Sequence, residues 1–133
     1  MIIKSKKILS EISAGELIDK ISILEIKLEK INNKESLEEI NKEYKLLKEV
    51  QNSQIKMTGN LETLIKKIKN VNLNLWNIED KLRICEKNKD FGKTFIELAR
   101  RVYLNNDRRS KIKTEINKIL QSNIREIKQY VDY

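Results

Sequence analysis

Six arginines, all in the second half of this chain, are the residues whose chemistry is most specific. They lie between Arg83 and Arg125, whereas lysine supplies all the positive charge before position 83. The guanidinium group is a planar fork of five donors that matches carboxylate and phosphate groups, so an arginine in a lysine-rich sequence marks a place where that geometry matters. The only tryptophan, Trp76, and the only cysteine, Cys85, lie in the same region. We therefore look for a functional site between about Trp76 and Lys113.

Two polar stripes on neighbouring helices are predicted to form this site. The first stripe begins at Asn72 and continues at a spacing of 4, 3 and 4 residues, which keeps its members on one face of a helix. The second stripe, on the last helix, consists of Tyr103, Asn106 and Lys113, with Ser110 near them. If the stripes face each other, they enclose cations, one carboxylate, a tryptophan and amides, which suits an anionic ligand that carries hydroxyl groups or a ring. The predicted ligand-binding residues are Trp76, Glu79, Arg83, Tyr103, Asn106, Arg109 and Lys113. The alternative is an exposed flank of ion pairs such as Glu79 with Arg83, each worth about 0.3–0.5 kcal/mol.

Arg109 and Asn105 interrupt an otherwise apolar row of the last predicted helix. A buried arginine is costly unless an acid satisfies it. We therefore expect the guanidinium to lie against Glu79 of the facing helix, or against Asp19 or Glu25 of the first helix. One interpretation is structural, because a polar residue in such a row fixes helix register and oligomeric state. The other interpretations are a guanidinium that faces a ligand and a helix phase that leaves it on the surface. The charges of the first helix are otherwise expected to form an ordinary solvated face.

The net charge of +8 is concentrated in the half of the chain that contains the arginines. Residues 1–66 carry 12 lysines and 11 acids, a net charge of +1, whereas residues 67–133 carry 16 lysines and arginines and 9 acids, a net charge of +7. The basic half therefore suits anionic partners, among them phosphorylated metabolites, sugar nucleotides and nucleic acid. The alternative is a solvated, lysine-rich surface.

Residues that the chain lacks exclude several classes of site. There is no histidine, which rules out a Ser-His-Asp triad and a metal site built from histidine and cysteine. We predict no metal and no cofactor, and we assign no catalytic residue. A single cysteine cannot form an intrachain disulfide, which fits a reducing, cytoplasmic location. No apolar run approaches the roughly 18 residues of a membrane span, and we expect no signal peptide at the short, charged N-terminus.

Helices are the elements that must position these residues, because the chain has no proline, three glycines and few aromatic residues. A capping box at Ser13 predicts the start of the first helix. Its apolar residues then repeat at heptad spacing over Leu17–Ile31. A second helix is expected to start at Asn33 or Ser36 and to run to about Gln51.

The two longest helices are predicted after a loop at residues 52–60. Apolar residues alternate at intervals of 3 and 4 over Leu61–Cys85, which predicts a third helix of about 28 residues. Asp90 is expected to cap the last helix, Lys93–Leu120. We prefer one continuous helix there to a break after Tyr103, because the apolar spacing keeps its phase across that point.

These elements predict an all-α protein, an antiparallel helical bundle dominated by two long helices. We expect residues 1–133 to form a single helical domain. Residues 1–12 form a lead-in that is extended near Ile2, and residues 122–133 form a tail that adds a further turn or an extended arm. Two long and two short helices enclose a thin core, and heptad spacing is typical of coiled coils, so we expect a homodimer or a higher oligomer.

Three segments resemble the motifs of an uncharacterised family. They begin at Ser13 (SAGELIDKISILEIK), Asn74 (NLWNIED) and Phe95 (FIELARRVYLNNDRR). The family consists of short bacterial and phage proteins that carry a domain of unknown function, and the resemblance covers nearly the whole chain apart from residues 32–60. It implies a free-standing helical domain and supplies no activity.

Three functions are compatible with these features. We prefer a non-catalytic binding or assembly module, which presents a basic helical surface containing Trp76 to an anionic ligand or a partner protein. The second is a small enzyme that acts on an anionic sugar- or nucleotide-linked metabolite, with Glu79 as its acid or base. The third is nucleic-acid binding through the basic half. Its signal is weak, because acids lie among the arginines and no aromatic array accompanies them.

Overall fold

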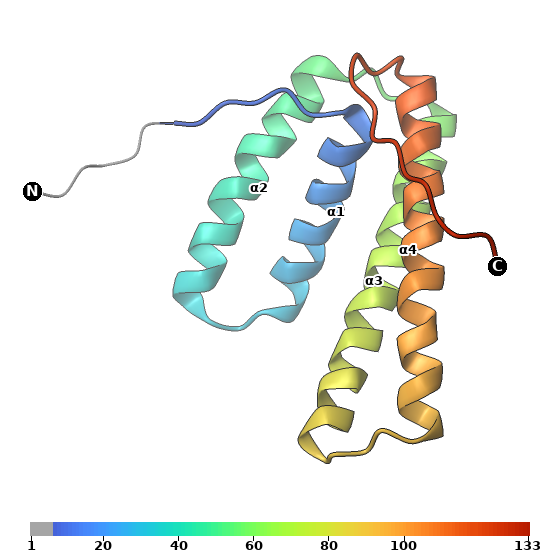
Figure 1. Cartoon of the computed structure of the whole chain (residues 1–133). Helices are drawn as coiled ribbons and strands as arrows, with labels where there is room; N and C mark the ends of the chain where they lie inside the picture. Colours follow the sequence, from blue (N-terminus) through green and yellow to red (C-terminus); the bar gives the residue numbers. More distant parts are fainter. Residues whose placement is uncertain (1–6) are drawn as a thin grey trace, which may run out of the picture.

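The computed structural model describes residues 7–133, which form four α-helices and no strand (Figure 1). The helices are α1 Ala14–Lys30, α2 Lys34–Gln54, α3 Gly59–Lys87 and α4 Lys93–Ile119. The predicted all-helical fold is therefore confirmed, and α3 and α4 are the longest helices, with 29 and 27 residues. None of these helices combines the length and the hydropathy that a bilayer span requires. The extension expected near Ile2 lies outside the described residues.

Short polar side chains begin three of the helices. The Ser13 hydroxyl accepts a hydrogen bond from the Glu16 amide at 3.2 Å, as the capping-box spacing predicts. Asn33 caps α2 by accepting from the amide of Ser36 at 2.9 Å, so the earlier of the two expected starts is correct. Thr58 caps α3 in the same way. These local hydrogen bonds satisfy amides that have no partner within their helix.

Two predicted boundaries differ from the structure. The loop expected at residues 52–60 is confined to residues 55–58, because its polar residues instead form the last turn of α2 and the first turn of α3. Asp90 does not cap α4. Its Oδ1 accepts from the amide of Gly92 at 3.1 Å, and Gly92 itself is the N-cap residue without a side-chain hydrogen bond. The helix α4 is continuous past Tyr103, as preferred.

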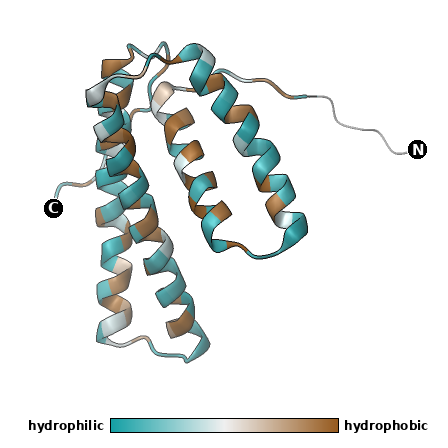
Figure 2. Ribbon diagram, turned by 180° about the vertical axis from the view of Figure 1, so that it is seen from behind, coloured by the Kyte–Doolittle hydropathy of each residue, from teal (hydrophilic) through white to brown (hydrophobic). Residues whose placement is uncertain are grey.

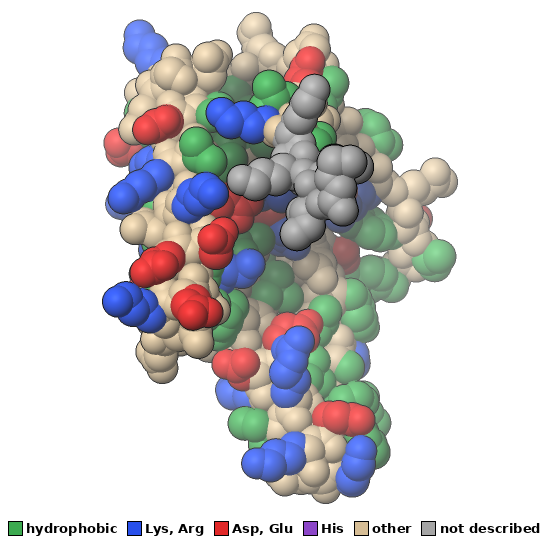
Figure 3. Space-filling model, turned by 90° about the vertical axis from the view of Figure 1, so that its left-hand side faces the viewer, with side chains coloured by type: hydrophobic (Ala, Val, Ile, Leu, Met, Phe, Trp, Pro, Cys, Tyr) green, Lys and Arg blue, Asp and Glu red, His purple; other side chains and the backbone are tan. Residues whose placement is uncertain are grey.

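The helices form two hairpins, α1–α2 and α3–α4, of which the second is longer (Figure 1). α1 contacts all three other helices, whereas α2 packs against α1 alone. The turn end of α3–α4 extends beyond the first hairpin as an arm of two helices. On the side of α2, acidic and basic side chains are interspersed (Figure 3), as expected for a solvated face. α1 is therefore the helix that can connect groups on α3 with groups on α4.

The apolar core is divided into two clusters, and the inner faces of the helices are correspondingly hydrophobic (Figure 2). The first cluster, where α1 meets α3 and α4, contains Ile18, Leu61, Leu64, Ile68 and Ile116. The second lies within the arm and contains Ile78, Cys85 and Leu98. Every residue of the predicted α3 row is buried or half-buried, so its periodicity is confirmed. Between the clusters, α3 and α4 also contribute the buried polar residues Asn72 and Asn105, beside the buried Val71.

The buried face of the last turns of α4 is turned partly away from the predicted row, of which Ile116 is still fully buried. Ile119 is 44% exposed, whereas Lys113 and Asn117 are buried. The cause is α1, which approaches α4 so closely that a Cβ atom added at Gly15 would lie 2.6 Å from the backbone oxygen of Lys113. The buried face of α4 is thus set by α1 and α3 together, which a single row of apolar residues cannot indicate.

The tail after α4 is extended and adds no further helical turn. The Ser122 hydroxyl accepts from the amide of Ala14 at 3.0 Å, and Asn123 donates to the Glu11 carboxylate at 2.7 Å. These contacts hold the beginning of the tail against the beginning of α1. From there residues 126–133 run back along α4 (Figure 1).

Candidate functional site

A buried ion pair between α1 and α4 lies at the centre of the predicted site. The Asp19 carboxylate is fully buried, and Arg109 donates to both of its oxygens, from Nε to Oδ1 at 2.8 Å and from Nη2 to Oδ2. Asn72 of α3 donates to the same Oδ1 at 2.9 Å and to the Ser22 hydroxyl at 2.7 Å. The hydrogen bond to Asp19 raises the pKa of Arg109. Asp19 is one of the three acids expected to meet Arg109, and that expectation is confirmed.

Lys113 connects this pair to two further carboxylates. Its Nζ lies 2.7 Å from Glu16, 3.1 Å from Glu126 and 3.9 Å from Asp19. Burial alone would lower the pKa of Lys113, but the hydrogen bonds to Glu16 and Glu126 outweigh it and raise that pKa. We call these five residues, including Arg109, the ion cluster. It contains two cations and three carboxylates. The positive charges that would attract an anionic ligand are therefore already neutralised within the cluster.

The N-terminal amides of α1 are also occupied. Besides the Ala14 amide, which donates to Ser122, the amide of Gly15 donates to Oδ1 of Asn117 at 2.7 Å. Because free amides and the helix dipole make a helix N-terminus attractive to anions, this occupation removes a second reason to place an anion near α1.

Four of the seven predicted site residues lie together in one hollow. The hollow has a volume of about 230 Å³, and the four predicted residues that line it are Trp76, Glu79, Asn106 and Arg109. Ile23, Ile26, Asn72 and Leu75 complete the lining. The two polar stripes therefore face each other in part, and α1 closes one side of the space between them.

The other three predicted residues lie elsewhere. Arg83 is exposed in the arm and pairs with Glu79 at 3.4 Å, which is the helix-neighbour ion pair considered as the alternative. Tyr103 packs its ring edge-to-face against Tyr133 of the tail, with centroids 5.7 Å apart. Lys113 belongs to the ion cluster. The three residues are separated from the hollow for different reasons. The arm, which carries Arg83, extends past α1. The tail packs against Tyr103, and α1 binds Lys113 at the end of α4.

A second groove between α3 and α4 is lined by residues that are not among the seven predicted site residues. It has a volume of about 520 Å³, and we call it the basic groove; its lining residues are Asn74, Asn77, Ile78, Lys81, Arg101, Leu104, Asn105 and Arg108. Within residues 7–133, no carboxylate forms an ion pair with Lys81, Arg101 or Arg108. The groove therefore combines three cations with three amides and contains no acid.

Asn105 is the most buried polar residue of the basic groove, with 6% of its surface exposed. Its Nδ2 donates to the backbone oxygen of Arg101 at 2.8 Å, but its Oδ1 has no hydrogen-bond partner among the described residues. A buried acceptor without a partner costs about 1–3 kcal/mol. The predicted polar interruption of the α4 row is therefore real at Asn105, and a purely structural role leaves this cost unexplained.

The sequence did contain a signal for the basic groove. Asn74, Asn77 and Lys81 follow one another at intervals of 3 and 4 residues, and so do Arg101, Leu104 and Arg108. Each set lies on one helical face, and neither set contains an acid. These faces do not stand out in the sequence, because an ordinary solvated face is also a row of cations and amides.

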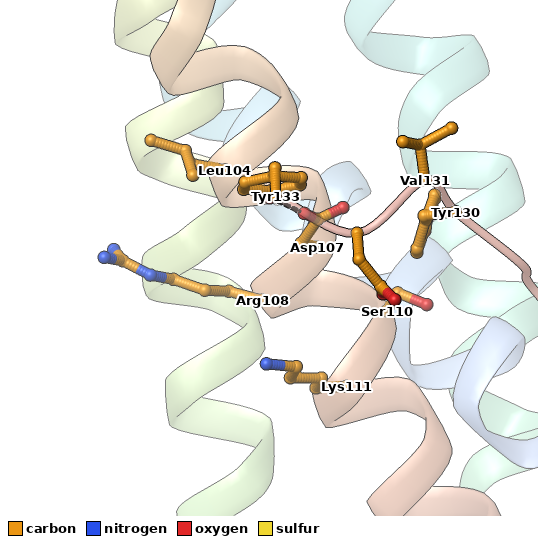
Figure 4. A pocket seen from close by; sticks show the side chains of 9 residues that line it. Leu104, Asp107, Arg108, Ser110, Lys111, Tyr130, Val131 and Tyr133 are labelled. Carbon is orange, nitrogen blue, oxygen red and sulfur yellow. Dashed lines mark hydrogen bonds between the residues drawn. The ribbon is translucent and has the colours of Figure 1, made fainter.

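The tail borders the basic groove along α4. Tyr130, Val131 and Tyr133 lie beside α4 in Figure 4, where they help to enclose a pocket of about 420 Å³. The Tyr133 hydroxyl donates to the Asp107 carboxylate, and this hydrogen bond raises the pKa of Tyr133. Arg108 lines both this pocket and the basic groove, so the tail and the groove share part of one wall.

Comparisons with known proteins identify one family. A model described as a family of unknown function, DUF6165, matches residues 8–132. No curated protein and no solved structure matches the chain. Among residues 7–133, no group of three or more His, Cys, Asp or Glu side chains is arranged to hold a metal ion.

Proposed function

Because the chain belongs to the DUF6165 family, whose function is unknown, we propose a function from its own geometry: a non-catalytic module that binds an anionic ligand in the basic groove. The observation that carries the proposal is the charge of the groove, where three cations and three amides converge without a carboxylate. Guanidinium and ammonium groups are the natural donors to phosphate and carboxylate oxygens. The volume of about 520 Å³ lies within the usual range of small-molecule sites.

In this proposal the anion binds to Arg101 and Arg108, and not to Arg109 as the sequence predicted. Arg109 already donates to both oxygens of Asp19, and the carboxylates of the ion cluster outnumber its cations. Coulomb attraction for a further anion is therefore weaker there than in a groove without acids. A structural role for the ion cluster and a binding role for the basic groove account for both observations.

The lining of the basic groove favours binding over acid–base catalysis. It contains no carboxylate, thiol or phenol that could exchange a proton with a bound molecule near neutral pH. Glu79, the acid or base of the alternative enzyme hypothesis, lines the separate hollow and is paired with Arg83. The enzyme hypothesis consequently has less support than the binding hypothesis.

Titration of the isotope-labelled protein with pyrophosphate, followed by amide chemical shifts, tests the proposal. We expect shifts at the basic groove and at least tenfold weaker binding when Arg101→Gln and Arg108→Gln are combined. Arg100→Gln is the matched control for each single groove substitution, because it removes one positive charge from an adjacent, exposed residue of α4 that does not line the groove. The proposal is wrong if pyrophosphate causes no shifts, or if Arg100→Gln weakens binding as much as either groove substitution does.

A single-stranded oligonucleotide is the probe for the nucleic-acid alternative. Backbone contacts would give an affinity that falls steeply with salt concentration and that also weakens in Arg100→Gln, because exposed cations outside the groove would contribute. The small-anion proposal instead expects the oligonucleotide to bind more weakly than pyrophosphate at physiological salt.

We also propose that the chain forms a homodimer through its arm. The cluster of Ile78, Cys85 and Leu98 is covered by two helices only, and Ile84, Phe91 and Ile96 are exposed around it. Exposed apolar side chains that gather in one region are typical of association surfaces. A second arm packed against the first would cover them.

A further inference from the structure

We infer that the ligand of the basic groove is a phosphate monoester that also carries hydroxyl groups, and that one of these hydroxyls donates to Oδ1 of Asn105. The inference rests on the proposed function and names the chemical class of the ligand. It combines three features of the groove: the spacing of its cations, the acceptor that has no partner, and the exposed amides around it.

The spacing of the cations calls for a ligand longer than a single phosphate group. Arg101 and Arg108 lie seven residues apart on α4, which corresponds to about 10 Å along a helix. Asn105 lies between them on the same helix, and Lys81 faces them from α3. A phosphate can bind near one guanidinium while the remainder of the molecule extends along the groove. A doubly charged phosphate monoester also matches several cations better than a single carboxylate does.

The orphaned oxygen of Asn105 calls for a donor, which a bare oxyanion does not supply. The orientation of the amide follows from its hydrogen bond, because a flipped amide would place Oδ1 against the carbonyl oxygen of Arg101. Oδ1 can only accept a hydrogen bond, and the oxygens of an ionised phosphate also only accept. Oδ1 is covered in this conformation, so the Asn105 side chain must turn toward the groove for a ligand hydroxyl to donate to it. That hydrogen bond then recovers the cost of leaving a buried acceptor without a partner.

The rest of the lining suits a carbon skeleton with several hydroxyls. Asn74 and Asn77 are exposed amides, each of which offers donors and an acceptor. Ile78 and Leu104 supply apolar contacts for C–H groups. Amides with apolar neighbours next to cations match a phosphorylated sugar or polyol better than they match a uniformly charged chain.

Calorimetric titration with a matched pair of phosphate monoesters tests this assignment. Ribose 5-phosphate carries hydroxyls, methyl phosphate does not, and both are dianions near neutral pH. We expect wild-type protein to bind ribose 5-phosphate about tenfold more tightly than methyl phosphate, which corresponds to about one well-placed hydrogen bond. Free ribose should bind far more weakly than either ester, because it lacks the anion.

Asn105→Leu should reduce the preference for ribose 5-phosphate to less than twofold and leave the affinity for methyl phosphate within twofold of wild type. Asn105→Thr retains an acceptor oxygen and should keep part of the preference, and circular dichroism confirms that each variant is folded. If Asn105→Leu does not fold, Asn105→Thr alone decides, because a preference lower than in wild type supports the assignment and an unchanged one overturns it.

The outcomes separate this inference from the function on which it rests. Equal binding of the two esters by wild-type protein, or a preference that survives in Asn105→Leu, overturns the role of Asn105. The groove is still an anion site in that case if Arg101→Gln combined with Arg108→Gln weakens binding at least tenfold. Binding of free ribose as tightly as its phosphate overturns the assignment of a phosphate ester. Failure of both esters and of pyrophosphate to bind overturns the proposed function itself.

Discussion

Asp19 is a carboxylate that the fold removes from water almost completely, and the arrangement around it shows what such burial requires. Arg109 donates two hydrogen bonds, and Asn72 donates a third. Bidentate, charge-assisted hydrogen bonds offset desolvation better than a single contact does. The pair therefore joins α1, α3 and α4 at one point between the two apolar clusters.

Replacing Arg109 with leucine should destabilise the protein by about 3 kcal/mol, because it leaves a buried carboxylate without its main partner. Water cannot compensate for the lost partner, because the Asp19 carboxylate is fully buried. Urea denaturation measures the loss, and Asp19→Asn in the same chain should recover a large part of it. An Arg109→Leu variant as stable as wild type would show that Asp19 does not depend on Arg109.

At the scale of elements, the contact between α1 and α4 depends on a glycine. The position of Gly15 leaves no space for a Cβ atom, which would meet the backbone of Lys113 first and the Asn117 side chain next. We expect Gly15→Ala to lower stability by about 1–3 kcal/mol through overpacking. Gly59→Ala is the matched control. It also lies in the first turn of a helix, but nothing is within 4 Å of its added Cβ, so it should stabilise by about 0.4–1 kcal/mol. Thermal unfolding of the two variants compares them directly, and similar melting temperatures would contradict the close contact.

The attachment of the tail should depend on pH. The hydrogen bond from Lys113 lowers the pKa of Glu126 below its ordinary value of 4.5. Because the folded-state pKa lies below the unfolded-state value, the contact stabilises the attached tail above pH 4.5, and this contribution is lost as the pH falls through the folded-state pKa. Amide signals of residues 126–133 should therefore shift toward those of a detached chain as the pH is lowered from 7 to 3.

Glu126→Gln serves as the comparison for this titration. The variant cannot form the ion pair, so part of the change should already be present at pH 7 and the acid-dependent step should be smaller. Wild-type tail signals that are the same at both pH values would show that Glu126 does not hold the tail.

At the scale of the whole molecule, the unequal lengths of the two hairpins leave an arm with little cover. Sedimentation at micromolar concentration should give a dimer, and Ile96→Glu should give monomers, because it places a charge on the exposed apolar surface of the arm. Val50→Glu on α2 is the control, since Val50 is also exposed but lies far from the arm in sequence and on a different hairpin. A wild-type chain that sediments as a monomer contradicts the proposal.

Local features of the chain were sufficient to predict its helices. Ser13 and Asn33 cap helices through hydrogen bonds within a few residues, and the apolar row over Leu61–Cys85 reports burial on one face of one helix. Both signals depend on neighbours in sequence, so they are visible without the fold. The presence of a polar interruption at Asn105 and Arg109 could be predicted for the same reason.

The partners of these residues were decided only by the tertiary structure. A row of residues identifies a helical face but does not state which helix covers it, and α1 proved to cover the end of α4 and to bury Asp19 and Lys113 there. The convergence of Lys81 with Arg101 depends on how α3 and α4 pack, because their charges are equally compatible with solvent exposure. Sequence alone thus determined the elements and their polar interruptions, whereas the division between a neutralised ion cluster and an acid-free basic groove came from contacts between residues far apart in the chain.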